Sequence, residues 1–529
     1  MNFEVRAITA RSVTIELENE AKYSCMVPVK LYLDGVMIKD DIPNVYSIFG
    51  LEPDREYRLL AVAGDEEEIG RDISHSGERI KTAKETVLLN VRDFGAKGDG
   101  ICNDTSFIQS AVLSCPPGGT VYFPGGTYLT GPVFLKSNIN LWLDRGAVLF
   151  ACGSRSLYPV LPGMTLCTDE DGEYNLGSWE GNPLDTYASL ITGIEAENVN
   201  IFGEGTVDGG GDRGDWWKDE KLRRGAWRPR TVFLCRCRNI LLQGITVRNS
   251  PSWTIHPYYS DELRLYSLKI RNPSDAPNTD GIDPESCRSV EILGADISVG
   301  DDCIAIKSGK YYMALKHHKP CEDIIVRNCL LQSGHGSVTI GSECAGGIYR
   351  VHVSGCVFNG TDRGMRIKTR RGRGRRAVID DIVFEHILMK DVKMPFVVNM
   401  FYFCDPDGHS DYVQSRETLP VDDMTPRIEG IRASDIVCKE VSVCFLCAYG
   451  LPEEKIGEIS LSDINASYKE PECCMEEVPA MMDGLSPMKG KGIFIRNAKR
   501  VSLENVELKG ISDIRPDVLS VDSLEVKDA

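Results

Sequence analysis

Four short polar clusters in the middle of the chain combine residue types that could do acid–base chemistry. The residues of interest are Asn278 and Asp280 in NTDGID, Asp301, Asp302 and Lys307 in GDDCIAIKSG, His335 in SGHGSVTIGSE, and Arg366 and Lys368 in RIKT. Carboxyl groups within reach of one bond are the equipment of glycoside hydrolysis, in which one protonates the leaving oxygen and another activates water. The residue types therefore indicate acid–base chemistry on a sugar bond.

The spacing of the clusters indicates that they meet in space. Asp302 follows Asp280 by 22 residues, His335 follows Asp302 by 33, and Arg366 follows His335 by 31. In a stack of coils, residues one coil apart form a column, so these side chains would line one surface groove. Asp301 and Asp302 would point to opposite faces of a regular strand, so both reach the groove only if a turn at Gly300 breaks the alternation. Crowding of the carboxylates would raise the pKa of at least one.

The elements that position these clusters are short, repeated strands. From about residue 135 the chain repeats a unit of two β runs joined by a bend that is often Gly, Asn or Asp, for example NVNIFGEGTVDGG, NILLQGITVRNSP and SVEILGADISVGD. The units recur every 23 to 34 residues. Such a period predicts a solenoid, here a right-handed parallel β-helix with coils about 4.8 Å apart. A β-propeller is the main alternative, but its four-stranded blades need about 40–45 residues each.

The all-β reading extends to a separate N-terminal unit. Residues 1–84 alternate apolar and polar residues, and Tyr57 follows a Leu51-x-Pro53 turn, which resembles the tyrosine corner of fibronectin type III β-sandwiches. Residues 85–529 would form the β-helix. A helical period near residues 104–115 predicts a short helix that caps its open end, with Phe107, Ile108, Ala111 and Val112 on one face.

Composition limits the remaining classes of function. The chain has 529 residues, a formal net charge of −18 and no apolar run near the roughly 20 residues that span a bilayer. The N-terminal residues lack a signal-peptide pattern, so we expect a cytoplasmic protein without a membrane partner. The 19 cysteines are then expected to be buried free thiols. The histidines do not have metal-ligand spacing, so we expect no metal and no other cofactor.

The ordered set NTD, GDD, GHG and RIK resembles that of the polygalacturonases, glycoside hydrolase family 28. The resemblance runs from about Val91 to the last coils and includes two further stretches, NSPSWTIHP at 249–257 and DGGGDRGDWW at 208–217. It implies an inverting hydrolase of α-1,4-linked galacturonic acid, with oligogalacturonate or pectin fragments as the partner.

The resemblance also implies roles for the residues in the four clusters. Asp301 would be the general acid, Asp280 and Asp302 would hold and deprotonate the water, and His335 would tune the charge state of the acid. The substrate-binding candidates are Asn278, Lys307, Arg366, Lys368 and Tyr402, of which Arg366 and Lys368 would bind the substrate carboxylate beside the scissile bond. Rung spacing alone would put Asp280 about 5 Å from the GDD pair, closer to the retaining class, so inversion rests on the resemblance.

An insertion at 152–190 and the extra N-terminal unit resemble exo-acting bacterial members rather than endo-acting fungal ones. Loops inserted between coils can close one end of a groove. The candidate sugar platforms or pocket walls are Trp179, Glu180, Trp216, Trp217 and Trp253. Rhamnogalacturonan or xylogalacturonan fragments remain alternative substrates. A non-catalytic carbohydrate-binding β-helix is an alternative of another class, although it has no need of three aspartates on adjacent coils. A pectate lyase would need a calcium pattern that is not evident.

The stretch MRIKTRRGRGRR, Met365 to Arg376, holds seven basic residues in an acidic chain. Nucleic-acid binding is disfavoured because the protein is acidic overall and shows no nucleic-acid-binding module. We expect residues 370–376 to leave the strand as a Gly-hinged loop at the groove's edge, where Arg371 would bind a second uronate. A homo-oligomer is compatible with the sequence.

Overall fold

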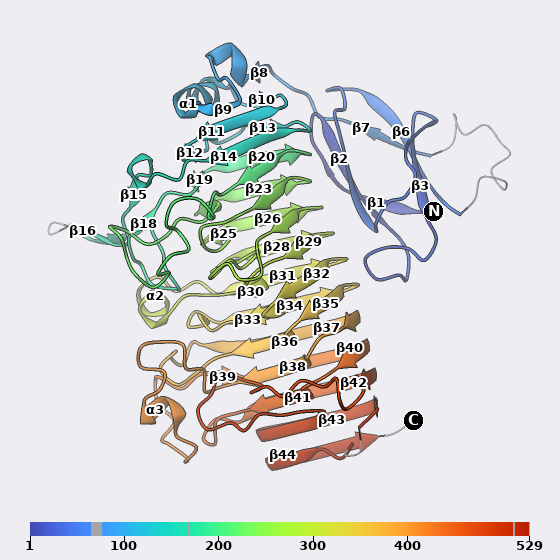
Figure 1. Cartoon of the computed structure of the whole chain (residues 1–529), viewed down its shortest axis with the longest axis vertical. Helices are drawn as coiled ribbons and strands as arrows, with labels where there is room; N and C mark the ends of the chain where they lie inside the picture. The colour runs from blue at the N-terminus through green and yellow to red at the C-terminus, as the bar shows by residue number, and fades with distance from the viewer. Residues whose placement is uncertain (65–76, 168–169, 512–513, 528–529) are drawn as a thin grey trace.

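The computed structural model describes residues 1–64, 77–167, 170–511 and 514–527. From residue 88 onward the chain winds into a parallel β-helix, whose coils stack from the N-terminal end at the top of Figure 1 to the C-terminal end at the bottom. The coils wind to the right, as strand–crossover–strand connections do. The predicted solenoid is therefore confirmed.

Each complete coil takes part in three parallel ladders, and in the later coils one long strand spans the first and second ladders together. The first ladder contains β8 (Leu88–Asn90), β10 (Thr120–Phe123), β13 (Asn140–Leu143), β20 (Glu197–Gly203), β23 (Arg238–Gln243), β26 (Asp261–Tyr266), β28 (Arg288–Leu293), β31 (Cys321–Arg327), β34 (Ile348–Ser354), β37 (Val378–Lys390), β40 (Gly430–Val441) and β42 (Ile456–Tyr468). The second contains β9 (Asp99–Asn103), β11 (Gly126–Thr130), β14 (Ala147–Ala151), β21 (Thr206–Asp208), β24 (Thr246–Arg248), β27 (Lys269–Arg271), β29 (Asp296–Ser298), β32 (Leu330–Gly334) and β35 (Val357–Thr361).

The third ladder is the one that carries the polar clusters. It contains β12 (Val133–Phe134), β19 (Ile191–Ile194), β22 (Val232–Cys235), β25 (Ile255–Tyr258), β30 (Asp302–Ile306), β33 (Gly336–Ile340), β36 (Arg363–Lys368), β38 (Met394–Asn399), β41 (Cys444–Tyr449), β43 (Lys491–Lys509) and β44 (Asp517–Lys527). Ile282 bridges β25 to β30. The sequence repeats cover the first two strands of each coil, and this third strand lies in the interval between repeats.

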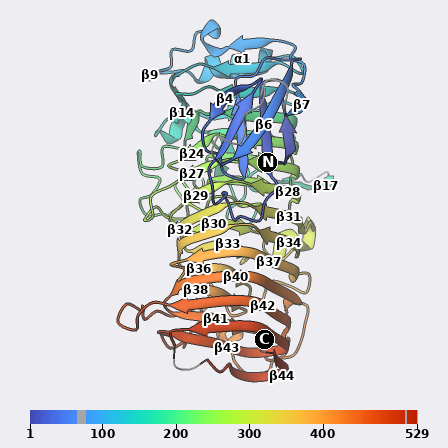
Figure 2. The same cartoon turned by 90° about the vertical axis from the view of Figure 1, so that its right-hand side faces the viewer.

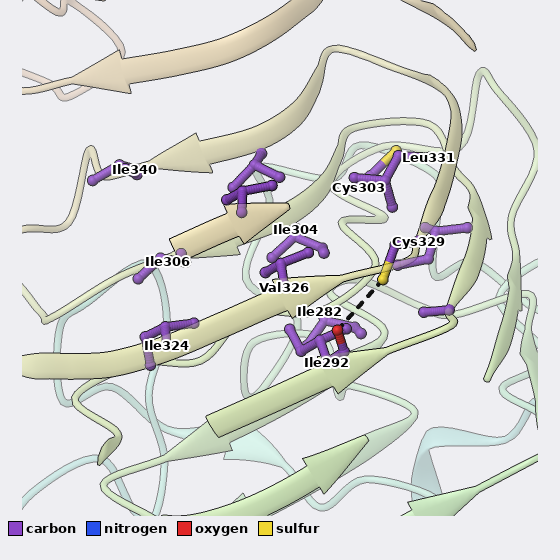
Figure 3. Packing of buried hydrophobic residues seen from close by; sticks show 14 of the residues in the cluster. Ile282, Ile292, Cys303, Ile304, Ile306, Ile324, Val326, Cys329, Leu331 and Ile340 are labelled. Atoms are coloured by element: carbon purple, nitrogen blue, oxygen red, sulfur yellow. Dashed lines mark hydrogen bonds between the residues drawn. The ribbon is translucent and has the colours of Figure 1, made fainter. Parts of the chain in front are cut away.

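The bore of the β-helix is filled by apolar ladders. Figure 3 shows labelled side chains such as Ile292, Ile304 and Ile340 pointing into this interior from two adjacent coils. Buried cysteines take the place of small apolar residues, and the Cys329 thiol donates to the Ile292 carbonyl oxygen at 3.5 Å. Burial of such stacks, at about 25 cal/mol per Å² of apolar surface, is the main force that stabilises the coils.

A short helix covers the N-terminal end of this bore, as expected. α1 (Thr105–Ser114) buries Ile108, Ala111 and Val112. Phe107 does not share that face fully: its side chain is 37% exposed and lies against Gly95. Other elements outside the ladders are η3 (Val91–Phe94), η4 (Arg155–Leu157), β15 (Val160–Leu161), β16 (Thr165–Cys167), β17 (Glu170–Tyr174), β18 (Thr186–Tyr187), α2 (Tyr311–Lys316) and α3 (Asp411–Gln414). The short strand β39 (Arg427–Ile428) pairs with the start of β37 in the first ladder. Among the described residues no helix combines the length and hydropathy that crossing a bilayer requires.

The N-terminal unit is a β-sandwich. One sheet has the order β1 (Phe3–Ile8), β2 (Ser12–Leu17) and β5 (Val45–Phe49), and the other β4 (Val36–Lys39), β3 (Val29–Leu33), β6 (Glu56–Ala63) and β7 (Glu78–Lys81). The Tyr57 hydroxyl accepts from the Glu52 backbone N–H at 2.8 Å, which is the contact that a tyrosine corner makes. The fibronectin type III assignment itself stays a prediction.

The sandwich packs against the outer face of the first ladder. Arg327 on β31 donates to both carboxylate oxygens of Glu16, each at 2.7 Å. Ala7 and Val45 pack on Tyr266 and Leu293 of β26 and β28. In Figure 1 the sandwich lies to the right of the upper half of the β-helix, and the loops with β15, β18, α2 and α3 project on the left; in Figure 2 the sandwich lies in front of the upper coils. The clusters of the third ladder therefore lie away from this unit.

Candidate active site

The three aspartates meet where β30 begins. One carboxylate oxygen of each of Asp280, Asp301 and Asp302 lies within 4.8 Å of those of the other two. Asp280 is on the preceding coil, where the Gly281 backbone N–H donates to the Asp302 carbonyl at 3.0 Å. The spacing of one coil therefore does bring these residues together.

A break in the strand alternation lets both members of the GDD pair reach the groove. Cys303 and Ile304 are consecutive, yet both pack in the core. The preceding turn is tight, because a Cβ atom on Gly300 would lie 2.5 Å from the Ala276 carbonyl oxygen. Asp301 and Asp302 thereby escape the opposite orientations that a regular strand would impose, as the sequence predicts.

Asp302 is the buried anion of the site. Arg366 Nη1 donates to its Oδ1 and Lys368 Nζ to its Oδ2, both at 2.9 Å. Burial alone would raise the pKa of Asp302, but the charges of Lys368 and Arg366 outweigh it and hold that pKa well below its usual range. Arg366 and Lys368 alternate on β36, so both point outward and keep Asp302 ionised.

Asp280 has the opposite electrostatic environment. It is buried, its Oδ1 has no hydrogen-bond partner among the described residues, and burial followed by the Asp301 charge raises its pKa well above the usual range. Asp301 is 24% exposed, and its Oδ1 lies 3.4 Å from Nδ1 of the half-exposed His335. The hydrogen bond with Asp301 raises the pKa of His335 despite its partial burial. The site thus combines one firmly ionised carboxylate, Asp302, with one whose pKa is raised, Asp280.

Lys307 and Trp253 lie beside the triad. Lys307 Nζ is 3.3 Å from Glu343 Oε2, 3.7 Å from Asp283 Oδ1 and 4.5 Å from the centroid of the Trp253 ring. Burial opposes the charge on Lys307, but Glu343 and Asp280 outweigh it and raise its pKa. Burial would raise the pKa of Glu343, but the charges of nearby cations, above all that of Lys307, outweigh burial and lower this pKa to about 2. These residues form a charged floor next to the three aspartates.

Asn278 and Glu180 reach this floor from different elements. Asn278 accepts a hydrogen bond from Arg228 Nη2 at 2.5 Å, which orients its amide beside the NTD turn. Glu180 comes from the insertion at 152–190; its side chain is 45% exposed, and Lys310 Nζ is 4.0 Å away. Asn278 thus contacts Arg228 and Glu180 lies near Lys310, and contact of either residue with a substrate stays a prediction.

The comparisons with known proteins assign the chain to a family. The model of the glycosyl hydrolases family 28 matches residues 153–484, the segment that holds the whole site. The chain belongs to this family. A second model, described as rhamnogalacturonase A/epimerase, pectate lyase-like, matches residues 88–145. A probable polygalacturonase of Vitis vinifera is 31% identical to this family 28 chain over 427 residues, which cover 78% of this chain and 82% of the relative.

Two solved structures resemble this family 28 fold over most of the chain. A family 28 exopolygalacturonase of Yersinia enterocolitica superposes with a TM-score of 0.68 at 20% identity, covering 99% of this chain and 98% of its own. An exopolygalacturonase of Thermotoga maritima gives a TM-score of 0.62 at 24% identity, covering 81% and 93%. At these identities the likeness shows the fold.

Tyr402 lines a small cavity next to the arginine–lysine pair of this family 28 site. The cavity measures about 10 Å³ and is enclosed by residues that include Arg366, Lys368, Tyr402 and Met481. Lys368 Nζ lies 5.3 Å from the centroid of the Tyr402 ring. Met481, in a segment that returns from the later coils, accepts from Arg366 Nη2 through its sulfur at 3.2 Å. The cavity is large enough for about one water molecule and not for a sugar.

The structure corrects the prediction for the cationic run, residues 365–376. Arg371 is 1% exposed and does not face the groove; it pairs with Glu453, with Nε–Oε1 at 2.6 Å and Nη2–Oε2 at 2.9 Å, and its Nη1 donates to three backbone carbonyls. Arg370 and Arg373 are also buried, and both bind Asp405, at 2.8 and 2.7 Å. Acids from loops of later coils thus neutralise the buried arginines of the run, whereas Arg375 and Arg376 at its end are exposed.

Arg230 was not identified from the sequence, although it lies against aromatic residues next to the site. Arg230 is 3% exposed, and its guanidinium carbon lies 5.0 and 4.9 Å from the ring centroids of Trp179 and Trp253. Burial lowers its pKa to about 10. The sequence does contain a signal for this residue, the stretch WRPR just before an apolar strand. Two arginines at the edge of a buried strand need partners, which indicates a buried contact.

Among the described residues, the triad is the group of side chains that could hold a metal ion. Both oxygens of Asp302 are already bound by Arg366 and Lys368. Because these cations already neutralise one of the three carboxylates, the donor set fits proton transfer better than metal binding.

Proposed function

We propose that this family 28 hydrolase cleaves α-1,4-galacturonosidic bonds of oligogalacturonate or pectin fragments and releases galacturonic acid from chain ends. The observation that carries the proposal is the triad of Asp280, Asp301 and Asp302 in contact with the Arg366–Lys368 pair. Carboxyl groups suit the hydrolysis of a sugar bond, and a cation pair suits a substrate that carries a carboxylate on every sugar. The names of the relatives, which are polygalacturonases, support the same substrate.

The proposed roles follow from exposure and charge. Asp301 is 24% exposed, so a glycosidic oxygen can approach it, and it acts as the general acid. Asp302 remains ionised beside Lys368 and Arg366 and accepts the proton of the attacking water. Asp280 holds that water from the other side, and His335 adjusts the charge at Asp301. The reaction inverts the anomeric carbon in this proposal, which rests on family membership rather than on the carboxyl separation.

Exo action is supported by the insertion at 152–190. The ring of Trp179 contacts Arg228 and Arg230 on a coil that precedes the triad, and the neighbouring Gly181 contacts Lys310, which follows the triad strand β30. A groove that is covered on one side of the triad admits a chain end rather than the middle of a polymer. The Arg366–Lys368 pair lies on the following coils, where the next uronate of the chain would bind.

Product analysis tests this proposal directly. The purified protein would be incubated with hexagalacturonate, and early products would be separated by anion-exchange chromatography. Galacturonic acid as the only new short product supports exo hydrolysis, and a mixture of lengths refutes it. A fully methyl-esterified hexamer is the matched substrate control, since it removes the carboxylates that the cation pair would bind. Growth of an ultraviolet-absorbing double bond would instead indicate a lyase.

We also propose that the enzyme works in the cytoplasm on imported fragments. The 18 cysteines whose side chains the structure describes are free thiols, a state that a reducing compartment preserves. Fractionation of the source cells, with detection of the protein by antibody, tests this; recovery in the external medium would contradict it.

A further inference from the structure

The tip of the insertion is held against the groove by aromatic and cationic contacts. The rings of Trp179 and Trp227 stack with centroids 4.7 Å apart and an interplanar angle of 6°. The backbone of Trp179 pairs with that of Asn182 in a tight turn, which places Glu180 and Gly181 at its end. Both turn residues have positive φ, 46° at Glu180 and 75° at Gly181. The tip is therefore a fixed turn rather than an extended loop.

The tip meets the loop that follows β30. The Lys310 backbone N–H donates to the Gly181 carbonyl oxygen at 2.9 Å. A Cβ atom on Gly181 would lie 2.8 Å from Glu343 Cγ and 2.9 Å from the Lys310 nitrogen. Contacts this close leave no room for a side chain, so glycine is required here for space as well as for φ. Glu343 in turn contacts Lys307 beside the triad.

The side chain of Lys310 connects the tip to a third segment. Its Nζ lies 2.8 Å from Asp405 Oδ1, in the loop after β38, and 4.0 Å from Glu180 Oε2. Asp405 also binds Arg370 and Arg373 from the cationic run. Burial opposes the charge on Asp405, but Arg373 and Lys310 outweigh it and lower its pKa. One lysine thus joins the insertion, the β30 loop and the β38 loop.

We propose that Lys310 is a positioning residue that clasps the insertion tip to the Asp405 loop and thereby closes one end of the substrate groove. Its contribution is to specificity for chain ends, and it makes no contact with the reacting atoms. The inference rests on the proposed function, because closure matters only if the groove binds a sugar chain.

The clasp can be broken without leaving a buried charge unpaired. In Lys310→Met, Asp405 keeps Arg370 and Arg373, and Glu180 is partly exposed to water. The fold should therefore survive, in contrast to the usual cost of removing one partner of a buried pair. Lys310→Arg retains the charge and is the rescue variant. Lys316→Met, which removes an exposed lysine from the same short helical segment, is the matched control.

The experiment measures product lengths from hexagalacturonate at early times, together with KM and kcat on digalacturonate. We expect Lys310→Met to raise the share of products longer than the monomer by about ten-fold, the effect of one lost charged hydrogen bond. KM should rise with little change in kcat, because the tip positions the terminal sugar. Lys310→Arg should restore the wild-type pattern, and Lys316→Met should keep it. Unchanged products and KM in a folded Lys310→Met protein would overturn the proposal.

Gly181→Ala perturbs the same contact from the side of the insertion and leaves Lys310 intact, so it is the second test variant if Lys310→Met does not fold. It should change the products in the same direction, because the added Cβ displaces the tip; unchanged products would refute the clasp.

Failure of this proposal is distinguishable from failure of the proposed function. If the wild-type protein itself releases mixed lengths, exo action is wrong; if it releases only monomer and both variants do the same, only the clasp is wrong.

Discussion

Replacing Arg371 by methionine decides whether the cationic run belongs to the groove or to the scaffold. Arg371 is buried, its partner Glu453 is only 2% exposed, and the guanidinium makes two bonds to that carboxylate and three to backbone carbonyls. Breaking a buried pair by removing one partner typically costs about 3–5 kcal/mol, because the other charge stays in a medium that solvates it poorly. We expect Arg371→Met to lose stability of this size.

The assay is urea unfolding followed by tryptophan fluorescence, with kcat and KM measured on the fraction that remains folded. The midpoint should fall clearly, while KM for the oligogalacturonate should stay within about two-fold, since Arg371 does not reach the groove. A second variant, Arg371→Met with Glu453→Met, removes both charges and should recover most of the loss. A stable single variant with a raised KM would refute the reasoning and restore Arg371 to substrate binding.

Three further outcomes follow from the triad. Lys368→Met should raise the pKa of Asp302, so the acid limb of the kcat/KM profile should move to higher pH; an unmoved limb would show that Lys368 acts on substrate alone. Asp280→Asn should stabilise the fold above about pH 4, the ordinary range of a carboxyl group, because the raised pKa of Asp280 lowers stability as the pH rises; below that range the gain in thermal midpoint should vanish. Asp301→Asn should lower kcat by about 10²–10⁴-fold with unchanged unfolding, and a smaller loss would assign the acid elsewhere.

The sequence predicted the register of the site because a solenoid converts spacing into proximity. Asp280 and Asp302 are one coil apart, and the parallel pairing of Ile282 with Ile304 aligns them. The tight turn at Gly300 was also predictable, since only a break in the alternation exposes two consecutive aspartates. Both predictions depend on local geometry and on the repeat, which a single sequence contains.

The partners of the arginines were not predictable, because they lie far away along the chain. Arg371 pairs with a glutamate 82 residues later, and Arg370 with Asp405, 35 residues later. A dense run of arginines is compatible both with an exposed anion site and with several buried ion pairs. Only the fold tells which acids approach it. The same limit applied to Arg230, whose aromatic neighbours come from separate loops.

The contact between the N-terminal sandwich and the β-helix did leave a signal in the sequence. On a solvated outer face, the residues between core positions of a strand should be polar. On β23, however, Leu241 lies between the core residues Ile240 and Leu242, and it is 1% exposed because the sandwich covers it. Tyr266 and Leu293 show the same departure on the next two strands. Apolar residues at outward positions over consecutive coils therefore mark a covered face, and here they identify the face where the sandwich docks, leaving the third ladder open for the substrate.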